Sequence, residues 1–433
     1  MKPTCYLRLA SVFATLLVLS GGLDGSNIAF AQLNLSFDIE EPPFEYTKTE
    51  DHNRVSRLIA KLKSKEIKPE YTREQGYLAS MLDALEIPAS SQTLVFSKTS
   101  LQVRYISPRN PRAIYFNDDT YVGWVRGSSL MEISTVDPKL GAAFYTVDMM
   151  PWRAKIERAS YDCLGCHVTS MTQGVPGHTV RSVLPSIDGS VNAQTASSIT
   201  SHRSPFSQRW GGWYVTGRHG EMTHSGNALL RGDRLDTRDN GNRLNLRDDF
   251  DTYDYLSPYS DIVALMVLEH QSQLHNTMTR ADFSVRQLQH ESDGEDPTVA
   301  SENEWRAQLH MIAKPVVQEM LFCDETKLTS EVKGLLEFAH AFESRGPRDD
   351  QGRSLRQFDL KTRMFKYPLS YLIYSEAFDS LSEELRREVI RQLLDVLEAR
   401  DTSADYAHLT PQMRHDILEI LRATKPGFER DAS

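Results

Sequence analysis

The spacing of hydrophobic residues changes near residue 260, and this change constrains the fold more than any other feature of the chain. Between Thr93 and Val147, short β-branched and aromatic runs are separated by Ser-Pro, Asn-Pro, Asn-Asp-Asp and Gly turn signals, as in a small antiparallel sheet. Beyond Ser260, apolar residues recur at helical spacing nearly to the end. We therefore predict an α+β fold in which a small antiparallel β-rich region precedes a C-terminal all-α helical domain.

The helical pattern divides into separate segments. Two short helices are expected before the strands, at Val55 to Leu62 and Gln75 to Leu85. Six more are expected after them, near Asp261 to His290, Glu304 to Phe322, Ser330 to Phe342, Leu369 to Phe378, Glu383 to Ala399 and Gln412 to Ala423. The expected regions are residues 1–31, 32–150 with the helical lead and the strands, a Gly- and His-rich region 151–231, a polar linker 232–258, and the helical domain 259–433.

The first 31 residues have the pattern of a secretory signal peptide. Lys2 and Arg8 supply a positive start, an apolar stretch follows from Leu9 to Ser20, and Ala29-Phe30-Ala31 forms a small-x-small cleavage site. We expect the mature chain to begin at Gln32 in the periplasm or elsewhere outside the cytoplasm. The apolar stretch is too short to span a bilayer, and no later segment is expected to do so. An uncleaved anchor stays open as an alternative, because the stretch before the cleavage site is long.

Composition limits the chemistry that the 433 residues can perform. The 59 acidic residues outnumber the 49 basic ones, giving a net charge of −10, which speaks against a protein that binds nucleic acid. Four cysteines are too few for a disulfide framework. Any thiol chemistry must therefore come from a local arrangement of side chains.

One motif, Cys163-Leu164-Gly165-Cys166-His167, carries chemistry by itself. On one helical turn the two cysteines reach the edge of a porphyrin from the same side, and the imidazole that follows points toward its centre. In this motif the chain resembles the c-type cytochromes. The resemblance implies one covalent haem c, with Cys163 and Cys166 as its attachment points and His167 as the proximal iron ligand. It covers only the motif and its immediate neighbours.

The motif is also compatible with three other kinds of site: a thioredoxin-type redox pair, half of a zinc site, and a local disulfide. No β-α-β pattern surrounds the motif, as a thioredoxin-type site requires. A fourth thiolate for zinc is missing, because Cys323 is the only other cysteine beyond the predicted signal peptide. Haem attachment is therefore favoured, a disulfide is the main alternative, and Cys323 is expected to be a buried, unpaired thiol.

The sixth iron ligand decides whether such a haem carries electrons or performs chemistry. We rank Met222 first, because it lies in the Gly- and Trp-rich segment Trp210–His224, whose glycines allow a flat cofactor to approach. We rank His270 second, in an apolar helical stripe for which Ser260 is the expected N-cap. The stripe is completed by Ile262, Met266 and Leu274, and the remaining candidates are His224, His219, His202 and His178. His275, about 140° around the helix from His270, is not expected to ligate the same metal. Taken singly, each of these residues is more often core or surface than ligand.

Two functions follow from this pattern. The first is an exported monohaem c-type cytochrome that transfers electrons to a redox partner protein. The second is a periplasmic haem c enzyme, peroxidase-like or another oxidoreductase, whose sixth iron position is open or labile. The length of the chain exceeds what one haem needs, which favours an enzyme, but the dihaem peroxidases carry two motifs and this chain carries one. The sequence alone favours electron transfer. A structural or sensory haem is a third possibility.

Overall fold

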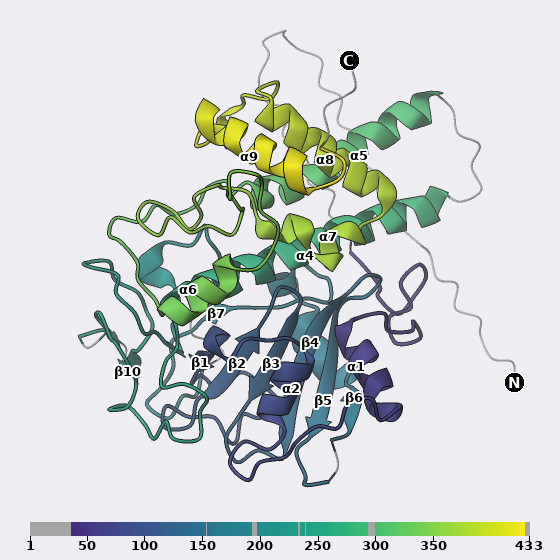
Figure 1. Cartoon of the computed structure of the whole chain (residues 1–433). Coiled ribbons are helices and arrows are strands. Elements are labelled where there is room, and N and C mark those ends of the chain that lie inside the picture. Colours follow the sequence, from purple (N-terminus) through teal and green to yellow (C-terminus); the bar gives the residue numbers. More distant parts are fainter. Residues whose placement is uncertain are drawn as a thin grey trace, which may run out of the picture. The chain divides into compact units, whose positions relative to one another are not determined.

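A seven-stranded antiparallel sheet organises the chain in the computed structural model, which describes residues 36–152, 154–192, 197–232, 234–238, 240–292 and 299–428 (Figure 1). The strand order is β6-β5-β4-β3-β2-β1-β9. The strands are β1 (Thr93–Val95), β2 (Arg112–Phe116), β3 (Thr120–Trp124), β4 (Leu130–Asp137), β5 (Gly141–Asp148), β6 (Ile156–Arg158) and β9 (Trp213–Tyr214). Together with the helices that follow, the sheet confirms the predicted α+β class. The predicted signal peptide and Gln32 lie outside the described residues.

The sheet has two differently covered faces, because side chains alternate along each strand. One face packs its apolar residues, such as Val122, Ile133 and Tyr145, against α1 (Arg54–Lys63) and α2 (Leu78–Ala84). The start of α1 is fixed by Asn53, whose side chain accepts hydrogen bonds from two backbone amides of the first turn. The opposite face carries polar residues and meets the long helix α4 across a cavity. Both predicted N-terminal helices are therefore present, although α2 begins three residues later than Gln75.

Helix α4 (Ile262–Ser292) is buried over most of its length. Its N-cap is Asp261, whose carboxylate accepts a hydrogen bond from the Ala264 amide at 2.8 Å. The prediction of Ser260 as the cap was wrong. The Ser260 hydroxyl instead donates to the Tyr214 carbonyl at 2.5 Å and accepts from the Leu94 amide at 2.9 Å. It therefore joins the start of the helix to β9 and β1.

The helices that follow α4 pack on it or on one another. They are α5 (Val299–Met320), α6 (Leu336–Glu343), α7 (Glu376–Asp379), α8 (Glu383–Leu397) and α9 (Pro411–Thr424), with α5 packed on both α4 and α8 (Figure 1). The single helix expected at Leu369 to Phe378 is divided into a 3₁₀ turn (Tyr371–Tyr374) and α7. The division falls at Ser375, which is extended and uses its hydroxyl to cap α7. No helix among the described residues is both long and apolar enough to cross a membrane.

The Gly- and His-rich region contains little regular structure, as expected. It includes the short helix α3 (Tyr161–His167) and a small hairpin of β7 (Arg181–Ser182) with β8 (Ser198–Ile199). A second hairpin, β10 (Leu229–Arg231) with β11 (Arg234–Asp236), extends into the predicted linker. A buried ion pair fixes this region to α4: Arg209 Nη1 lies 2.5 Å from Glu269 Oε1, and the two side chains are 2% and 0% exposed. The Trp210 indole donates to the other Glu269 oxygen at 2.9 Å.

We predict that Glu269→Ala lowers the free energy of unfolding by about 3–5 kcal/mol, because it leaves the Arg209 guanidinium buried without its partner. The matched control is Arg387→Ala, which removes one side of a pair whose side chains are 67% and 71% exposed. That change should cost less than about 1 kcal/mol. Urea unfolding of both variants checks the prediction, and equal losses would show that the buried pair has no special role.

Candidate functional site

The Cys-x-x-Cys-His motif lies on α3, at the edge of a cavity on the polar face of the sheet. Both thiols are free; Cys163 is half-buried and Cys166 is exposed. The cavity has a volume of about 110 Å³. Its lining comes from four parts of the chain: the strands, α3, the segment His178–Val180 with Trp213, and Leu268 and Ser272 of α4. The lining thus includes residues from both segments that carry the first two candidate ligands, Trp210–His224 and the helix that contains His270.

The strand register builds the floor of the cavity. One row across the sheet pairs Ile114 with Gly123 and Gly123 with Glu132. At Gly123 a Cβ atom would overlap the Arg112 guanidinium, so the glycine lets the Arg112 side chain cross above β3. Arg112 Nη2 reaches Glu132 Oε2 at 2.8 Å. The result is an ion pair in the cavity lining, formed by residues that the sequence analysis did not single out.

His167 is oriented for metal ligation. Its Nδ1 lies 2.8 Å from the Gly177 carbonyl oxygen and must donate the proton, because the carbonyl can only accept. The lone pair is therefore on Nε2, which has no hydrogen-bond partner among the described residues. Burial lowers the pKa of His167, so the ring is neutral near pH 7. A neutral imidazole whose Nδ1 is held by a backbone carbonyl is the usual form of a histidine metal ligand.

Helix α4 holds that carbonyl in place through Asn276. The Asn276 side chain accepts from the His178 amide at 2.8 Å and donates to the His178 carbonyl at 2.7 Å. Gly177 precedes His178 and supplies the carbonyl that His167 contacts. It has no room for a side chain, because an added Cβ would overlap the Asn276 amide group. The orientation of His167 thus depends on a glycine and an asparagine that lie 99 residues apart in the sequence.

Gly177→Ala should destabilise the protein by about 1–3 kcal/mol, because the added methyl group overlaps a side chain that is fixed by two hydrogen bonds. Gly165→Ala is the matched control: this glycine lies within the motif on α3 and has no atom within 4 Å of an added Cβ. It should be neutral or stabilising by up to about 1 kcal/mol, since alanine favours a helix. Denaturant melts of the two variants measure the difference, and similar values for both would contradict the proposed crowding at Gly177.

His178 lines the same cavity as His167, and neither of its ring nitrogens has a hydrogen-bond partner among the described residues. It follows Gly177, whose carbonyl oxygen contacts Nδ1 of His167. Its ring lies against Tyr121 and Phe144, with centroid distances of 4.3 Å and 6.3 Å. Of the candidates for a sixth iron ligand, His178 is the one that lines the cavity in the part of the chain that the structure describes.

Met222 does not line the cavity. It is buried, and its carbonyl oxygen lies 2.5 Å from Nδ1 of His219. His219 and His224 contact each other, with ring centroids 4.8 Å apart, and both pack near Phe206. The Trp210–His224 segment reaches the cavity through Trp213, whereas Met222 lies beside His219 in a separate histidine cluster.

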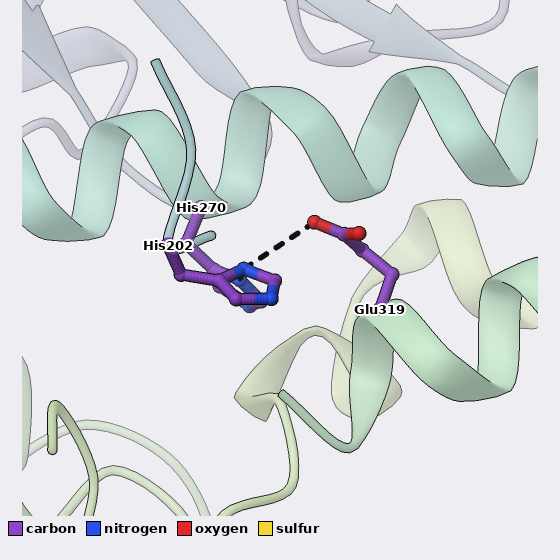
Figure 2. Close-up of side chains that lie close together, drawn as sticks. All are labelled: His202, His270 and Glu319. Atoms are coloured by element: carbon purple, nitrogen blue, oxygen red, sulfur yellow. Dashed lines mark hydrogen bonds and ion pairs between the residues drawn. The ribbon is translucent and has the colours of Figure 1, made fainter. Parts of the chain in front are cut away.

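His270 lies outside the lining as well, although Leu268 and Ser272 on either side of it belong to it. A helix turns about 200° over two residues, so His270 faces away from the cavity. Its ring nitrogens meet His202 Nδ1 at 3.2 Å and Ser370 Oγ at 2.9 Å, and Glu319 lies beside them (Figure 2). Burial lowers the pKa of His270 to about 3. The buried partners of His270 are therefore His202 and Ser370.

Tyr121 and His275 form a second polar contact next to the cavity. The Tyr121 hydroxyl accepts from Gln271 Nε2 at 2.9 Å and lies 3.1 Å from His275 Nδ1. Tyr121 also contacts His178, with ring centroids 4.3 Å apart. Tyr121, Arg112 and Glu132 were not predicted as site residues. The signal in the sequence that could have indicated them is the alternation of polar and apolar residues along the strands. His275 and His270 have different hydrogen-bond partners.

Comparison of the chain with protein-family models, with curated proteins and with solved structures finds no match in any of the three.

Proposed function

We propose that this chain is an exported haem c protein in which Cys163 and Cys166 attach one haem and His167 is the proximal ligand. The observation that carries the proposal is the neutral His167 ring, with Nδ1 donating to Gly177 and Nε2 free beside a cavity that Cys163 also lines. Free thiols at positions i and i+3 of one helical turn match the spacing that thioether attachment needs. When bound, the haem supplies redox chemistry and a site for a sixth ligand at iron.

The first test is the covalent bond. Wild-type protein matured in a host that attaches haem c should keep its haem through acid-acetone extraction, and changing Cys163 and Cys166 to Ser should abolish this retention. Cys323→Ser is the control, because Cys323 is buried, forms no disulfide and lies far from the motif in sequence. Haem that is extractable from the wild-type protein would contradict the proposal.

Within this proposal, the geometry favours an open or labile sixth position, and hence an oxidoreductase or small-molecule-binding haem protein. No methionine lines the cavity among the described residues, and its only histidines are His167 and His178. A thioether is therefore not available to the sixth position, and His178, the other imidazole in the lining, has no hydrogen-bond partner that would fix its ring as a ligand. The periplasmic haem c enzyme, which is the second function predicted from the sequence, is therefore better supported than the electron carrier.

The chain's own residues give such a cavity a defined polarity. The Arg112–Glu132 pair places both charge signs in the lining, and Gln102 donates to Glu132 at 2.9 Å. Burial raises the pKa of Tyr121 far above its usual value, so the phenol keeps its proton at neutral pH. Arg112 can bind an anionic group, and Tyr121 can hold a proton that it shares with His275. These groups would orient a small polar substrate next to the iron.

The electron carrier stays the second candidate, and one observation favours it. No residue of α3 is buried, and Cys166 is exposed. A haem attached there would keep the edge nearest Cys166 close to solvent, where a redox partner protein can approach. A carrier, however, usually has both axial positions filled.

Carbon monoxide distinguishes the two functions. We predict that the oxidised protein contains high-spin iron and that CO changes the spectrum of the reduced protein. His178→Ala should leave both properties unchanged, since no hydrogen bond holds the His178 ring in place as a ligand. Low-spin iron that does not respond to CO would support the carrier. Loss of the low-spin state in Met222→Ala or His270→Ala would then identify the ligand that displaces the open-site proposal.

A further inference from the structure

We propose that His202, His270 and Glu319 bind one divalent transition-metal ion, at a site separate from the haem cavity (Figure 2). The three side chains come from distant parts of the sequence: the loop after β8, the middle of α4, and the end of α5. The three side chains meet in the interior of the protein: His202 and His270 are 0% exposed and Glu319 is 1% exposed. Burying three ionisable groups at one point is costly unless they share a charge partner, so the cluster needs an explanation.

The distances match those between ligands of one metal ion. His202 Nδ1 lies 3.2 Å from His270 Nδ1 and 3.4 Å from Glu319 Oε1. Two ligands of a tetrahedral ion with bonds of about 2.0–2.1 Å are separated by roughly 3.3–3.4 Å. Two of the three donor pairs therefore already have the spacing of a coordination sphere, and all three donor atoms lie within 4.8 Å of one another.

The hydrogen bonds direct the lone pairs toward the shared point. His270 Nε2 contacts Ser370 Oγ at 2.9 Å; when it donates there, its lone pair is on Nδ1 and faces His202. Glu319 Oε1 is buried and accepts no hydrogen bond from the described residues. Without a metal, the two Nδ1 atoms can face each other only if one of them carries a proton, and Glu319 Oε1 has no hydrogen-bond partner among the described residues. A cation between them binds all three atoms at once.

Surrounding residues hold the three ligands and leave a path for entry. Arg203 Nη1 donates to the outer oxygen of Glu319 at 2.7 Å, which leaves Oε1 as a monodentate donor. The Arg203 side chain is 38% exposed, so its movement would connect the buried cluster to solvent. Phe322 stacks on the His270 ring at 4.2 Å, and Arg209 donates to the His202 carbonyl at 2.9 Å. Such outer contacts are what orient ligands in metal sites.

The donor set selects the class of ion. Two imidazoles and one carboxylate suit zinc or non-haem ferrous iron and leave at least one position for water or a substrate. Calcium and magnesium prefer oxygen ligands alone and are disfavoured. The site lies on the face of α4 opposite Leu268 and Ser272, so one stretch of helix separates it from the haem cavity.

Zinc binding tests the proposal, because zinc can be measured independently of haem iron. The full-length haem-loaded protein is freed of exchangeable metal with a chelator, dialysed against zinc, and analysed for zinc per chain. Wild type should bind one equivalent, and its melting temperature should rise with zinc concentration, since an ion that binds only the folded state stabilises it. Glu319→Gln should weaken zinc binding at least 10-fold. Glu325→Gln, which removes a nearby carboxylate outside the cluster, should leave it unchanged.

Two results would overturn the proposal. If wild type binds no zinc and its melting temperature does not respond to the metal, the cluster is a hydrogen-bonded core element. If Glu319→Gln and Glu325→Gln bind zinc as wild type does, the ion is adventitious and lies elsewhere. The wild-type measurement decides even if Glu319→Gln fails to fold. Ser370→Ala gives a milder variant, in which zinc affinity should fall because His270 loses the contact that fixes its proton on Nε2.

Discussion

The buried ion pair between Arg209 and Glu269 is the interaction on which both sites depend. It joins the irregular segment that contains His202 and Trp213 to the middle of α4. Through the same guanidinium, Arg209 holds the His202 carbonyl, and the indole next to it completes the bonds of Glu269. A charge removed from water at this depth is tolerated only when its partners are fully in place. The segment therefore cannot shift along the helix without breaking the pair, and the residues on either side of it are fixed as well.

Helix α4 then acts as a wall with two differently used faces. Leu268 and Ser272 face the cavity next to the Cys-x-x-Cys-His motif, and His270 faces His202 and Glu319. Further along, Asn276 fixes the backbone that orients His167. One rigid element thus positions the candidate haem ligand and the candidate metal site, and both depend on the antiparallel sheet that covers its cavity side.

The sequence predicted the regular parts of this structure well, because the hydrophobic spacing of strands and helices is a local property. The predicted bounds of α8 and α9 lie within two residues of the observed ones. The sequence could not predict the directions in which the candidate side chains point. Met222 and His270 were reasonable ligand candidates by spacing and setting, but a turn of the Trp210–His224 segment and the rotation of α4 aim them elsewhere. Arg112 and Glu132 were missed because their meeting depends on Gly123, which lies on the strand between them. Glu319 was missed because only the packing of α5 brings it to His202.

The central claim is that the motif attaches a haem, and mass analysis of one peptide tests it most directly. Trypsin cuts after Arg158 and Arg181, which releases a peptide that contains Cys163, Cys166 and His167. In protein matured where haem c is attached, this peptide should carry the mass of one haem bound through both cysteines. A peptide that is unmodified, or lighter by two hydrogens because its cysteines form a disulfide, would contradict the account.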